Sequence, residues 1–306
     1  MGNKTPTVSV ITATYNRSNV LSCAIKSVLQ STFSEWELLI IGDGCTDDTA
    51  QVVGAFADPR IQFSNLPENF GEQSKPNNLG ASLARGRYLA YLNHDDLWFP
   101  DHLAVAVDCL EGKKADFVFT LGISPRPGKS SLLLGAAPGG EYRPTIHLPA
   151  SLWVFRRELI ETIGPWRSFR ECYTYPSQDW LLRLWRSGAR IQMAPQLTVI
   201  HFASGHRRDV YRTREFAENA SYLKRMCSEA DFRQRELLNL ALDLEQPSSA
   251  LEITSLLRRA TINAAKRLGM SLGITPIELI GYISGRRKGR MLQRLRQQRG
   301  LPRLSH

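Results

Sequence analysis

The sequence predicts an α/β fold in which a mostly parallel central sheet is flanked by helices, followed by a helical C-terminal extension. Strand-like apolar runs alternate with amphipathic helical segments from Val8 onward, and this alternation is typical of parallel sheets. Among the 306 residues, 42% are hydrophobic and 22% are charged, which is the composition of a globular protein. Beyond about Tyr211 the pattern is helical. We therefore expect a sheet-containing domain over residues 1–210 and a helical extension with a basic tail over residues 211–306.

Local signals place the individual elements. Ser18 is suited to cap a helix whose apolar residues form one stripe, and Pro100 has the position of a first-turn proline. Pro, Gly and Ser are frequent over 124–142 without periodicity, so we expect a long functional or mobile connection there. The expected strands are 8–14, 37–41, 60–64, 87–92, 115–121, 151–155 and 197–201. The expected helices are 18–29, 46–56, 74–85, 100–110, 156–163 and 179–188.

The spacing of the cysteines and the length of the apolar segments indicate in which cellular compartment the protein is expected. Cys23, Cys45, Cys109, Cys172 and Cys227 are scattered without a close pair, which favours a reducing, cytoplasmic setting over a disulfide framework. The N-terminus has no charged and then apolar leader, and no window offers about 18 consecutive apolar residues. We therefore expect a cytoplasmic protein without a membrane span.

One strand ends abruptly in acidic residues. The apolar run that begins at Gly86 stops at Asn93-His94, which Asp95 and Asp96 follow directly. Ligands of open parallel sheets collect outside the carboxyl ends of the strands, and neighbouring carboxylates suit a hard divalent cation that bridges phosphate oxygens. Capping of the following helix is the alternative that this pattern leaves open.

Four segments carry polar residues in a fixed order. They are Thr14-Tyr15-Asn16-Arg17, then Gly42-Asp43-Gly44-Cys45-Thr46-Asp47-Asp48-Thr49, then the stretch from Asn69-Phe70-Gly71 to Asp96, and finally Gly164-Pro165-Trp166 with Gln178-Asp179-Trp180. Together, over residues 6–205, they resemble the inverting glycosyltransferases of family 2, which have the GT-A fold. The resemblance implies an enzyme that moves a sugar from a nucleoside diphosphate sugar, with a UDP-sugar as the first expectation.

The resemblance assigns a set of residues to the nucleotide. Tyr15 can stack on the base, with a core position at the rim as the alternative, and Asp43 matches the carboxylate that accepts a hydrogen bond from the base. Gly42 stands where the family pattern has its first Asp. A phosphate contact is one interpretation of Lys75 and surface solvation is the other. The full set is Thr14, Tyr15, Arg17, Asp43, Lys75, Asn93 and His94.

The resemblance also implies a cofactor, Mn²⁺ or Mg²⁺. Asp95 matches the metal-binding carboxylate of the family, whereas Asn93 replaces an acidic residue and should weaken the site. His201 and His206 follow the last strand, and we expect at most one of them, with His201 as the candidate, to bind the metal. A plain hydrogen-bonding role is the alternative for both.

The catalytic base implied by the resemblance is Asp179. It would take the proton of an acceptor hydroxyl as that oxygen attacks the anomeric carbon and inverts its configuration, a general-base contribution of roughly 10²- to 10⁴-fold. Capping of the following helix is the competing role for Asp179. Gln178 replaces the Glu of the family motif. Trp166, Gln178 and Trp180 are the candidates on the acceptor side.

The expected partners are the nucleoside diphosphate sugar and a glycan or lipid-linked acceptor. Neither a Gln-x-x-Arg-Trp motif nor a membrane span is present in the sequence, so we expect transfer of one or a few sugars. A sugar-nucleotide pyrophosphorylase would show an early Gly-rich loop, which is missing after Thr14. The remaining alternative is a non-catalytic nucleotide-sugar-binding protein of the same fold, suggested by Gly42, Asn93 and Gln178.

The basic tail is the other unusual region. The net charge is +10, and residues 279–306 contain eight Lys or Arg and no acidic residue, so the rest of the chain is nearly neutral. Basic residues beside Met291, Leu292 and Leu295 suit a peripheral contact with anionic lipid, at the inner face of the cell membrane. A solvated end is the alternative. No nucleic-acid partner is expected, because the tail from Gly285 to Arg303 has no aromatic residue to stack on bases.

Overall fold

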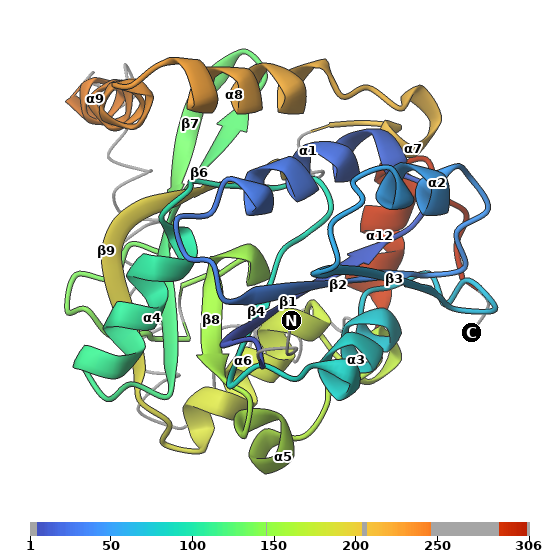
Figure 1. Ribbon diagram of the computed structural model, residues 1–306, viewed down its shortest axis with the longest axis horizontal. Coiled ribbons are helices and arrows are strands. Elements are labelled where there is room, and N and C mark those ends of the chain that lie inside the picture. The colour runs from blue at the N-terminus through green and yellow to red at the C-terminus, as the bar shows by residue number, and fades with distance from the viewer. Residues whose placement is uncertain (1–4, 145, 204–206, 246–287, 305–306) are drawn as a thin grey trace, which may run out of the picture.

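A central nine-stranded sheet organises the protein, as Figure 1 shows. The computed structural model describes residues 5–144, 146–203, 207–245 and 288–304. The strand order is β3-β2-β1-β4-β8-β6-β9-β5, and β7 pairs with β6. The strands are β1 (Val8–Thr14), β2 (Trp36–Gly42), β3 (Ile61–Asn65), β4 (Tyr88–Tyr91), β5 (Leu97–Trp98), β6 (Phe117–Arg126), β7 (Lys129–Leu134), β8 (Trp153–Arg156) and β9 (Ile191–Ile200).

The first half of the sheet is parallel and brings three strand ends together. β1 lies between β2 and β4, with Thr14 opposite Gly42 and Ile11 opposite Tyr91. The connecting helices are α1 (Ser18–Leu29), α2 (Thr49–Gly54) and α3 (Ser74–Leu83), with α1 and α2 on one side of the sheet and α3 on the other (Figure 1). The carboxyl ends of β1, β2 and β4 therefore meet at one edge, as the sequence predicts.

The second half of the sheet is mixed, which corrects the expectation of a mostly parallel sheet. β8 runs antiparallel to both β4 and β6, and β5 runs antiparallel to β9. Only the pairing of β6 with β9 is parallel in this half, within the described residues. The sequence could not show this, because a fully buried strand such as β8 is a continuous apolar run whichever direction it takes.

The expected long connection over 124–142 is also wrong in part. β6 continues to Arg126, and β7 returns beside it after a turn in which Gly128 has a φ of +65°. Leu132 and Leu133 on β7 are 38% and 40% exposed, so this strand lacks the buried alternation that identifies a strand in sequence.

The remaining helices of the sheet-containing part are α4 (His102–Gly112), α5 (Leu159–Ile163) and α6 (Pro176–Arg186), with the short 3₁₀ turns η1 (Ala150–Leu152) and η2 (Phe169–Glu171).

Aromatic rings join α6 to the sheet. Trp180 is fully buried, stacks on Trp153 with ring centroids 6.1 Å apart, and lies 5.1 Å from the ring of Phe155. Its indole nitrogen donates a hydrogen bond to the carbonyl of Gly164 at 2.8 Å. This packing fixes the start of α6 beside the ends of the parallel strands.

The described part of the C-terminal extension is helical, as predicted. It contains α7 (Val210–Thr213), α8 (Ala217–Ser228), α9 (Phe232–Glu245) and α12 (Arg290–Gln298). α8 packs against α1, and the side chain of Asn219 donates to the backbone carbonyl of Asp95 at 2.6 Å. The domain boundary at residue 210 stays a prediction. No helix in the described ranges is long and apolar enough to cross a membrane.

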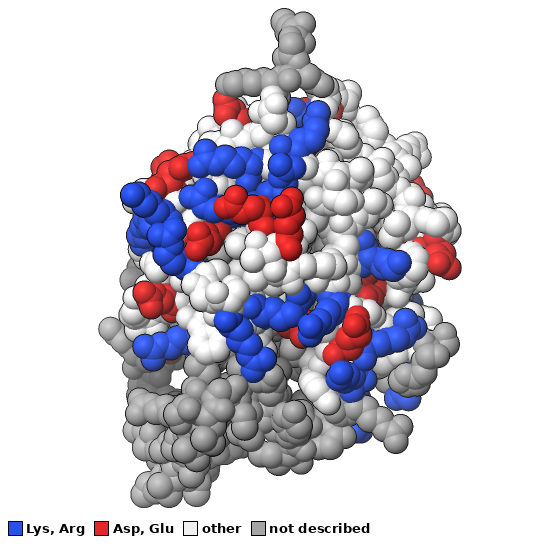
Figure 2. All heavy atoms as spheres, turned by 90° about the horizontal axis from the view of Figure 1, so that it is seen from below, with Lys and Arg blue, Asp and Glu red and all other residues white. Residues whose placement is uncertain are grey.

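The described surface carries both signs of charge. In Figure 2, Lys and Arg are interspersed with Asp and Glu on the face that is seen from below Figure 1. Ion pairs in the described part of the chain include Arg190 with Asp116 and Arg183 with Asp179. This mixture agrees with a body that is nearly neutral apart from its tail.

His102 at the start of α4 predicts a pH dependence of stability. The ring is 1% exposed, lies stacked on Trp98 and is hydrogen-bonded through Nδ1 to the Thr198 hydroxyl at 2.8 Å. Burial lowers its pKa to about 3. The unfolded chain, with a His pKa near 6.5, therefore binds more protons than the folded chain between these values, and stability falls as the pH falls. His102 alone should lower the free energy of unfolding by about 2 kcal/mol from pH 7 to pH 5.

Denaturant unfolding at the two pH values tests this prediction. In His102→Asn the drop between pH 7 and pH 5 should be smaller than in the wild type by that amount. An equal drop in both proteins would show that His102 does not carry the effect.

Candidate active site

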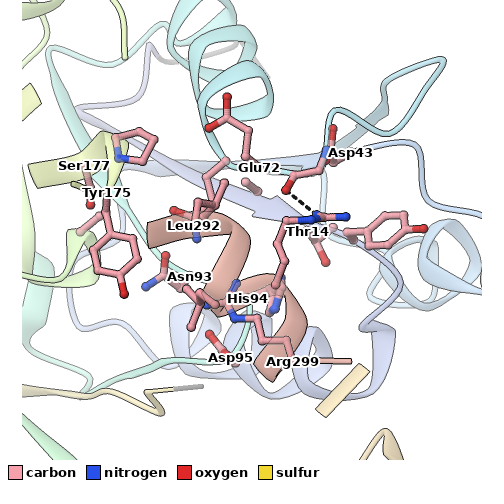
Figure 3. Close-up of a pocket in the computed structure, with 18 of the residues that line it drawn as sticks. Thr14, Asp43, Glu72, Asn93, His94, Asp95, Tyr175, Ser177, Leu292 and Arg299 are labelled. Carbon is pink, nitrogen blue, oxygen red and sulfur yellow. Dashed lines mark hydrogen bonds between the residues drawn. The ribbon is translucent and has the colours of Figure 1, made fainter. Parts of the chain in front are cut away.

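A cavity of about 260 Å³ lies at the carboxyl ends of β1, β2 and β4 (Figure 3). Its walls come from these strand ends, the start of α6, the end of β9 and the C-terminal segment. Residues that the sequence predicts for the site and that line it are Thr14, Tyr15, Asp43, Asn93, His94, Asp95 and His201. Segments more than 180 residues apart in the chain thus form one site.

Asp43 organises one end of the cavity. Its carboxylate accepts hydrogen bonds from the backbone N–H groups of Phe70 and Gly71 at 3.0 and 2.8 Å, and its carbonyl accepts from the Asn69 side chain at 2.9 Å. Burial raises its pKa, while the two N–H groups and the Arg296 guanidinium act in the opposite direction. Asp43 therefore holds the loop that follows β3 against the end of β2, in addition to the base contact that the resemblance implies.

The aromatic residue at the end of β1 lies where a nucleobase could stack. Tyr15 lines the cavity, and its ring centroid lies 6.1 Å from that of Tyr211, which also lines it. Arg17 is 3% exposed and lies over the Tyr211 ring at 5.4 Å, behind the cavity wall. Lys75 is exposed, with its ammonium 4.9 Å from the Phe70 ring, and is not among the lining residues. The structure therefore does not bring Lys75 to the site.

The adjacent acidic residues after β4 have different environments. Asp95 lines the cavity, whereas Asp96 is fully buried. The Asp96 carboxylate accepts hydrogen bonds from the Asn93 side chain at 2.9 Å, the Ser151 hydroxyl at 2.5 Å and the backbone N–H of Phe202 at 2.9 Å. Its fourth partner is Nδ1 of His201 at 2.9 Å. Asp96 therefore ties the end of β4 to η1 and to the end of β9.

The donor set fits the divalent cation that the resemblance implies. Asp95 and His201 line the same cavity, and the bond from His201 Nδ1 to Asp96 leaves the other ring nitrogen for a metal, as in the carboxylate–histidine pairs of metal sites. Burial favours the neutral ring, but the Asp96 carboxylate outweighs this effect and raises the pKa of His201. The described residues contain no group of three or more acidic, His or Cys side chains placed around one ion, so a bound diphosphate would have to complete the shell. His206 lies outside the described residues.

Asp179 lies apart from this cavity. It belongs to the first turn of α6, where its carboxylate pairs with Arg183 at 3.1 Å and Arg167 at 3.8 Å. Ser177, two residues earlier, lines the cavity, whereas Asp179 is not among the lining residues. A helix turns by about 100° per residue, so these two positions face nearly opposite directions. The structure therefore does not place Asp179 in the cavity that Asp95 lines.

The three candidates on the acceptor side are core residues, which corrects their expected role. Trp166 is 3% exposed and packs on Tyr91, with ring centroids 4.8 Å apart, and Trp180 belongs to the aromatic core described above. Gln178 is 2% exposed, and its amide exchanges two hydrogen bonds with the backbone of Leu148. These side chains shape the walls of the site from behind and offer no surface to an acceptor.

Sequence reasoning missed several lining residues. Glu72 lines the cavity, and its carboxylate accepts bonds from the backbone and hydroxyl of Ser74 at the start of α3. His147 and Tyr175 line it as well, in segments where no motif could single them out. A further missed group comes from the C-terminal segment and consists of Leu292, Leu295, Arg296, Arg299 and Leu301.

This last group corrects the lipid interpretation of the tail. Leu292 and Leu295 line the cavity, so these residues are not displayed for insertion into a membrane. Gly285 lies outside the described residues. The described part of the tail is a folded segment with a helix, not a solvated end.

Comparison with known proteins agrees with this architecture. Residues 9–131 match the profile of glycosyl transferase family 2. TuaG of Bacillus subtilis, named for teichuronic acid biosynthesis, is 32% identical over 154 residues, which are 50% of this chain and 57% of TuaG. The Escherichia coli glucosyltransferase WfgD is 31% identical over 113 residues, which are 37% of this chain and 44% of WfgD. The matches thus span about half the length of these relatives.

Solved structures give the same answer for the fold. TarS 1-349 of S. aureus, in complex with UDP-GlcNAc, has a TM-score of 0.56 at 18% identity, over 78% of this chain and 71% of that chain. A mannosyltransferase of Pyrobaculum calidifontis, in complex with GDP-Man and Mn²⁺, has a TM-score of 0.54 at 16% identity, over 92% of this chain and 87% of that chain. The α/β domain therefore has the GT-A fold of glycosyltransferases. Residues 9–131 of the chain are similar to glycosyl transferase family 2, as the motifs within them indicate.

The two adjacent aspartates give a matched pair of variants. In Asp96→Asn an amide N–H₂ group replaces one carboxylate oxygen, although the surrounding groups all donate hydrogen bonds. We therefore expect the free energy of unfolding to fall by about 3 to 5 kcal/mol. In Asp95→Asn the changed group faces the cavity, and we expect a change within about 0.5 kcal/mol. Denaturant unfolding at neutral pH measures both values. An equal loss in the two variants would contradict this division of roles.

Proposed function

We propose that the protein transfers a sugar from a nucleoside diphosphate sugar to an acceptor hydroxyl, with inversion at the anomeric carbon. The observation that carries the proposal is the joining of Asp43, Asn93, Asp95 and His201 in one cavity at the ends of parallel strands. This edge is where sheets of this kind bind nucleotides. Asp43 and Tyr15 would hold the base, and Asp95 and His201 would hold Mn²⁺ or Mg²⁺. When bound, the cation would act as a Lewis acid on the diphosphate leaving group.

The relatives narrow the choice of donor and acceptor. The name of WfgD specifies UDP-Glc as its donor and a diphosphoundecaprenol-linked sugar as its acceptor, and TuaG is named for teichuronic acid biosynthesis. We extend these features to this chain as proposals: a UDP-sugar donor, a glycan or lipid-linked acceptor, and one or a few transfers rather than processive synthesis. A lipid-linked acceptor would bring the protein to the inner face of the cell membrane.

Binding of the donor should depend on the cation. A thermal-shift screen with UDP, GDP, TDP and CMP, each with and without Mn²⁺, identifies the nucleotide, and calorimetry then gives its Kd. We expect UDP to bind at least about tenfold more weakly after the cation is removed with a chelator. Without the cation, the diphosphate loses its indirect contacts with Asp95 and His201. Asp95→Asn should show the same weak binding even when Mn²⁺ is present. Tight binding by Asp95→Asn in Mn²⁺ would exclude Asp95 as a ligand.

The proposed catalytic base, Asp179, is held in ion pairs outside the cavity. Asp179 is the carboxylate that the family motif assigns, and it lies in the first turn of α6. For it to accept a proton from an acceptor, however, its pairs with Arg167 and Arg183 must open and its side chain must reach the cavity. This position favours a second candidate function, a protein that binds nucleotide sugars without turnover.

Replacement of Asp179 by Asn decides between the two candidates. If Asp179 is the base, transfer to an acceptor and hydrolysis of the donor should fall by about 10²- to 10⁴-fold while UDP affinity is retained. Asp116→Asn is the matched control, because Asp116 also pairs with an arginine, Arg190 at 3.4 Å, and is not among the cavity lining. Full activity of Asp179→Asn would remove the proposed base. Tight binding of UDP-sugars by the wild type without any turnover would favour the binding protein.

A further inference from the structure

One face of α12 forms a wall of the cavity. Leu292, Leu295, Arg296 and Arg299 follow the spacing i, i+3, i+4, i+7, which places them on one side of a helix, and all four line the cavity. Arg290 and Arg294, on the other side, are exposed. In Figure 3 the helix that carries Leu292 passes across the site between the segments of Asp43 and Ser177.

This helix is anchored to the sheet-containing part of the chain. Arg296 is 5% exposed and donates from Nη1 to the carbonyl of Gly71 at 2.5 Å and from Nε to that of Pro302 at 3.0 Å. Gly71 has a φ of +76°, and a side chain there would meet Leu304 at 2.4 Å and Arg296 at 2.7 Å. The tail thus packs directly on the loop that Asp43 holds.

Backbone hydrogen bonds fix both ends of the helix. The N–H of Gly289 donates to Cys172 at 3.0 Å, and the N–H of Tyr211 donates to Arg299 at 3.2 Å. The Gln293 side chain also holds both the N–H and the carbonyl of Leu304, at 2.9 Å each. These contacts come from three separate segments, so α12 has one defined place over the cavity.

The arginine at the end of the helix lies near the proposed cation site. Figure 3 shows Arg299 and Asp95 at the same end of the cavity, beside His94. A ligand that reaches Asp95 through a cation therefore also comes within the field of Arg299.

We infer that α12 is part of the donor site, with Arg299 as a binding residue for the diphosphate and Arg296 as the residue that positions the helix. A guanidinium group offers paired N–H donors that match phosphate oxygens, and its charge offsets that of the leaving diphosphate. The inference rests on the proposed function for the identity of the ligand as a nucleoside diphosphate. It adds a diphosphate contact from the far end of the chain to a site that the family motifs place within its first two-thirds.

The test compares two arginines of the same segment in the full chain. Calorimetry with Mn²⁺ measures the Kd of UDP, of inorganic pyrophosphate and of uridine for the wild type, Arg299→Ala, Arg299→Lys and Arg294→Ala. Loss of a charge-assisted hydrogen bond should weaken UDP and pyrophosphate by about 10- to 100-fold in Arg299→Ala. Uridine, which lacks phosphate, should change less than about twofold, and Arg299→Lys should recover part of the loss because it keeps the charge. Arg294→Ala, which removes the same charge from the exposed side, should bind like the wild type.

The outcomes separate this inference from the proposed function. Unchanged UDP and pyrophosphate binding by Arg299→Ala, in a variant with a wild-type melting temperature, would overturn the inference and leave the proposed function standing. Tighter binding would also overturn it, because α12 would then compete with the donor. If the wild type binds pyrophosphate in an Arg299-dependent way but no nucleotide, the anion site stands and the nucleotide-sugar function fails. If the wild type binds neither, both fail.

Discussion

The buried carboxylate of Asp96 is the constraint on which the rest of the site depends. A charge without exposure to water is tolerated only where several donors surround it, and here they come from the end of β4, from η1 and from the end of β9. Any shift of one of these segments would break a bond to a buried charge. The rim therefore behaves as one rigid frame, and Asp95 faces the cavity because its neighbour is held inside. The same bond network orients the His201 ring, so a single buried residue sets the positions of both proposed metal ligands.

Much of the parallel half of the fold could be predicted from the sequence, because its signals are local. The apolar run of β1, the helical stripe of α1 and the polar residues after β1, β2 and β4 are all readable without knowing what packs against them. The mixed half could not be predicted in the same way. The direction of β8 and the partner of β7 depend on contacts with strands far away in the sequence. The amino-acid pattern of a strand, whether fully buried or half exposed, does not indicate which strand it pairs with.

The candidate site shows the same division between local and distant information. The acidic pair after β4 was readable as a motif, but which of the two aspartates faces a ligand depends on Ser151 and His201, which lie 55 and 105 residues from Asp96 in sequence. At the start of α6, the motif places a carboxylate in the first helical turn, yet the rotation of that turn decides which side chain meets the cavity. Gln178 is hydrogen-bonded to Leu148, and Trp180 is hydrogen-bonded to Gly164. These buried neighbours of Asp179 fix the rotation of the turn, so that Ser177 faces the cavity.

The C-terminal segment extends this reasoning to the question of where a basic amphipathic helix lies. Its sequence has the same pattern whether the apolar face rests on lipid or on protein, because both environments require leucines at helical spacing with arginines beside them. The two arrangements exclude each other for the same residue, since Leu292 cannot cover the cavity and enter a membrane at once. In the structure, Arg296 resolves this ambiguity by reaching the Gly71 carbonyl beside Asp43. This close approach requires a glycine at position 71, because a side chain there would meet Arg296 at 2.7 Å, and a lipid surface supplies no such contact.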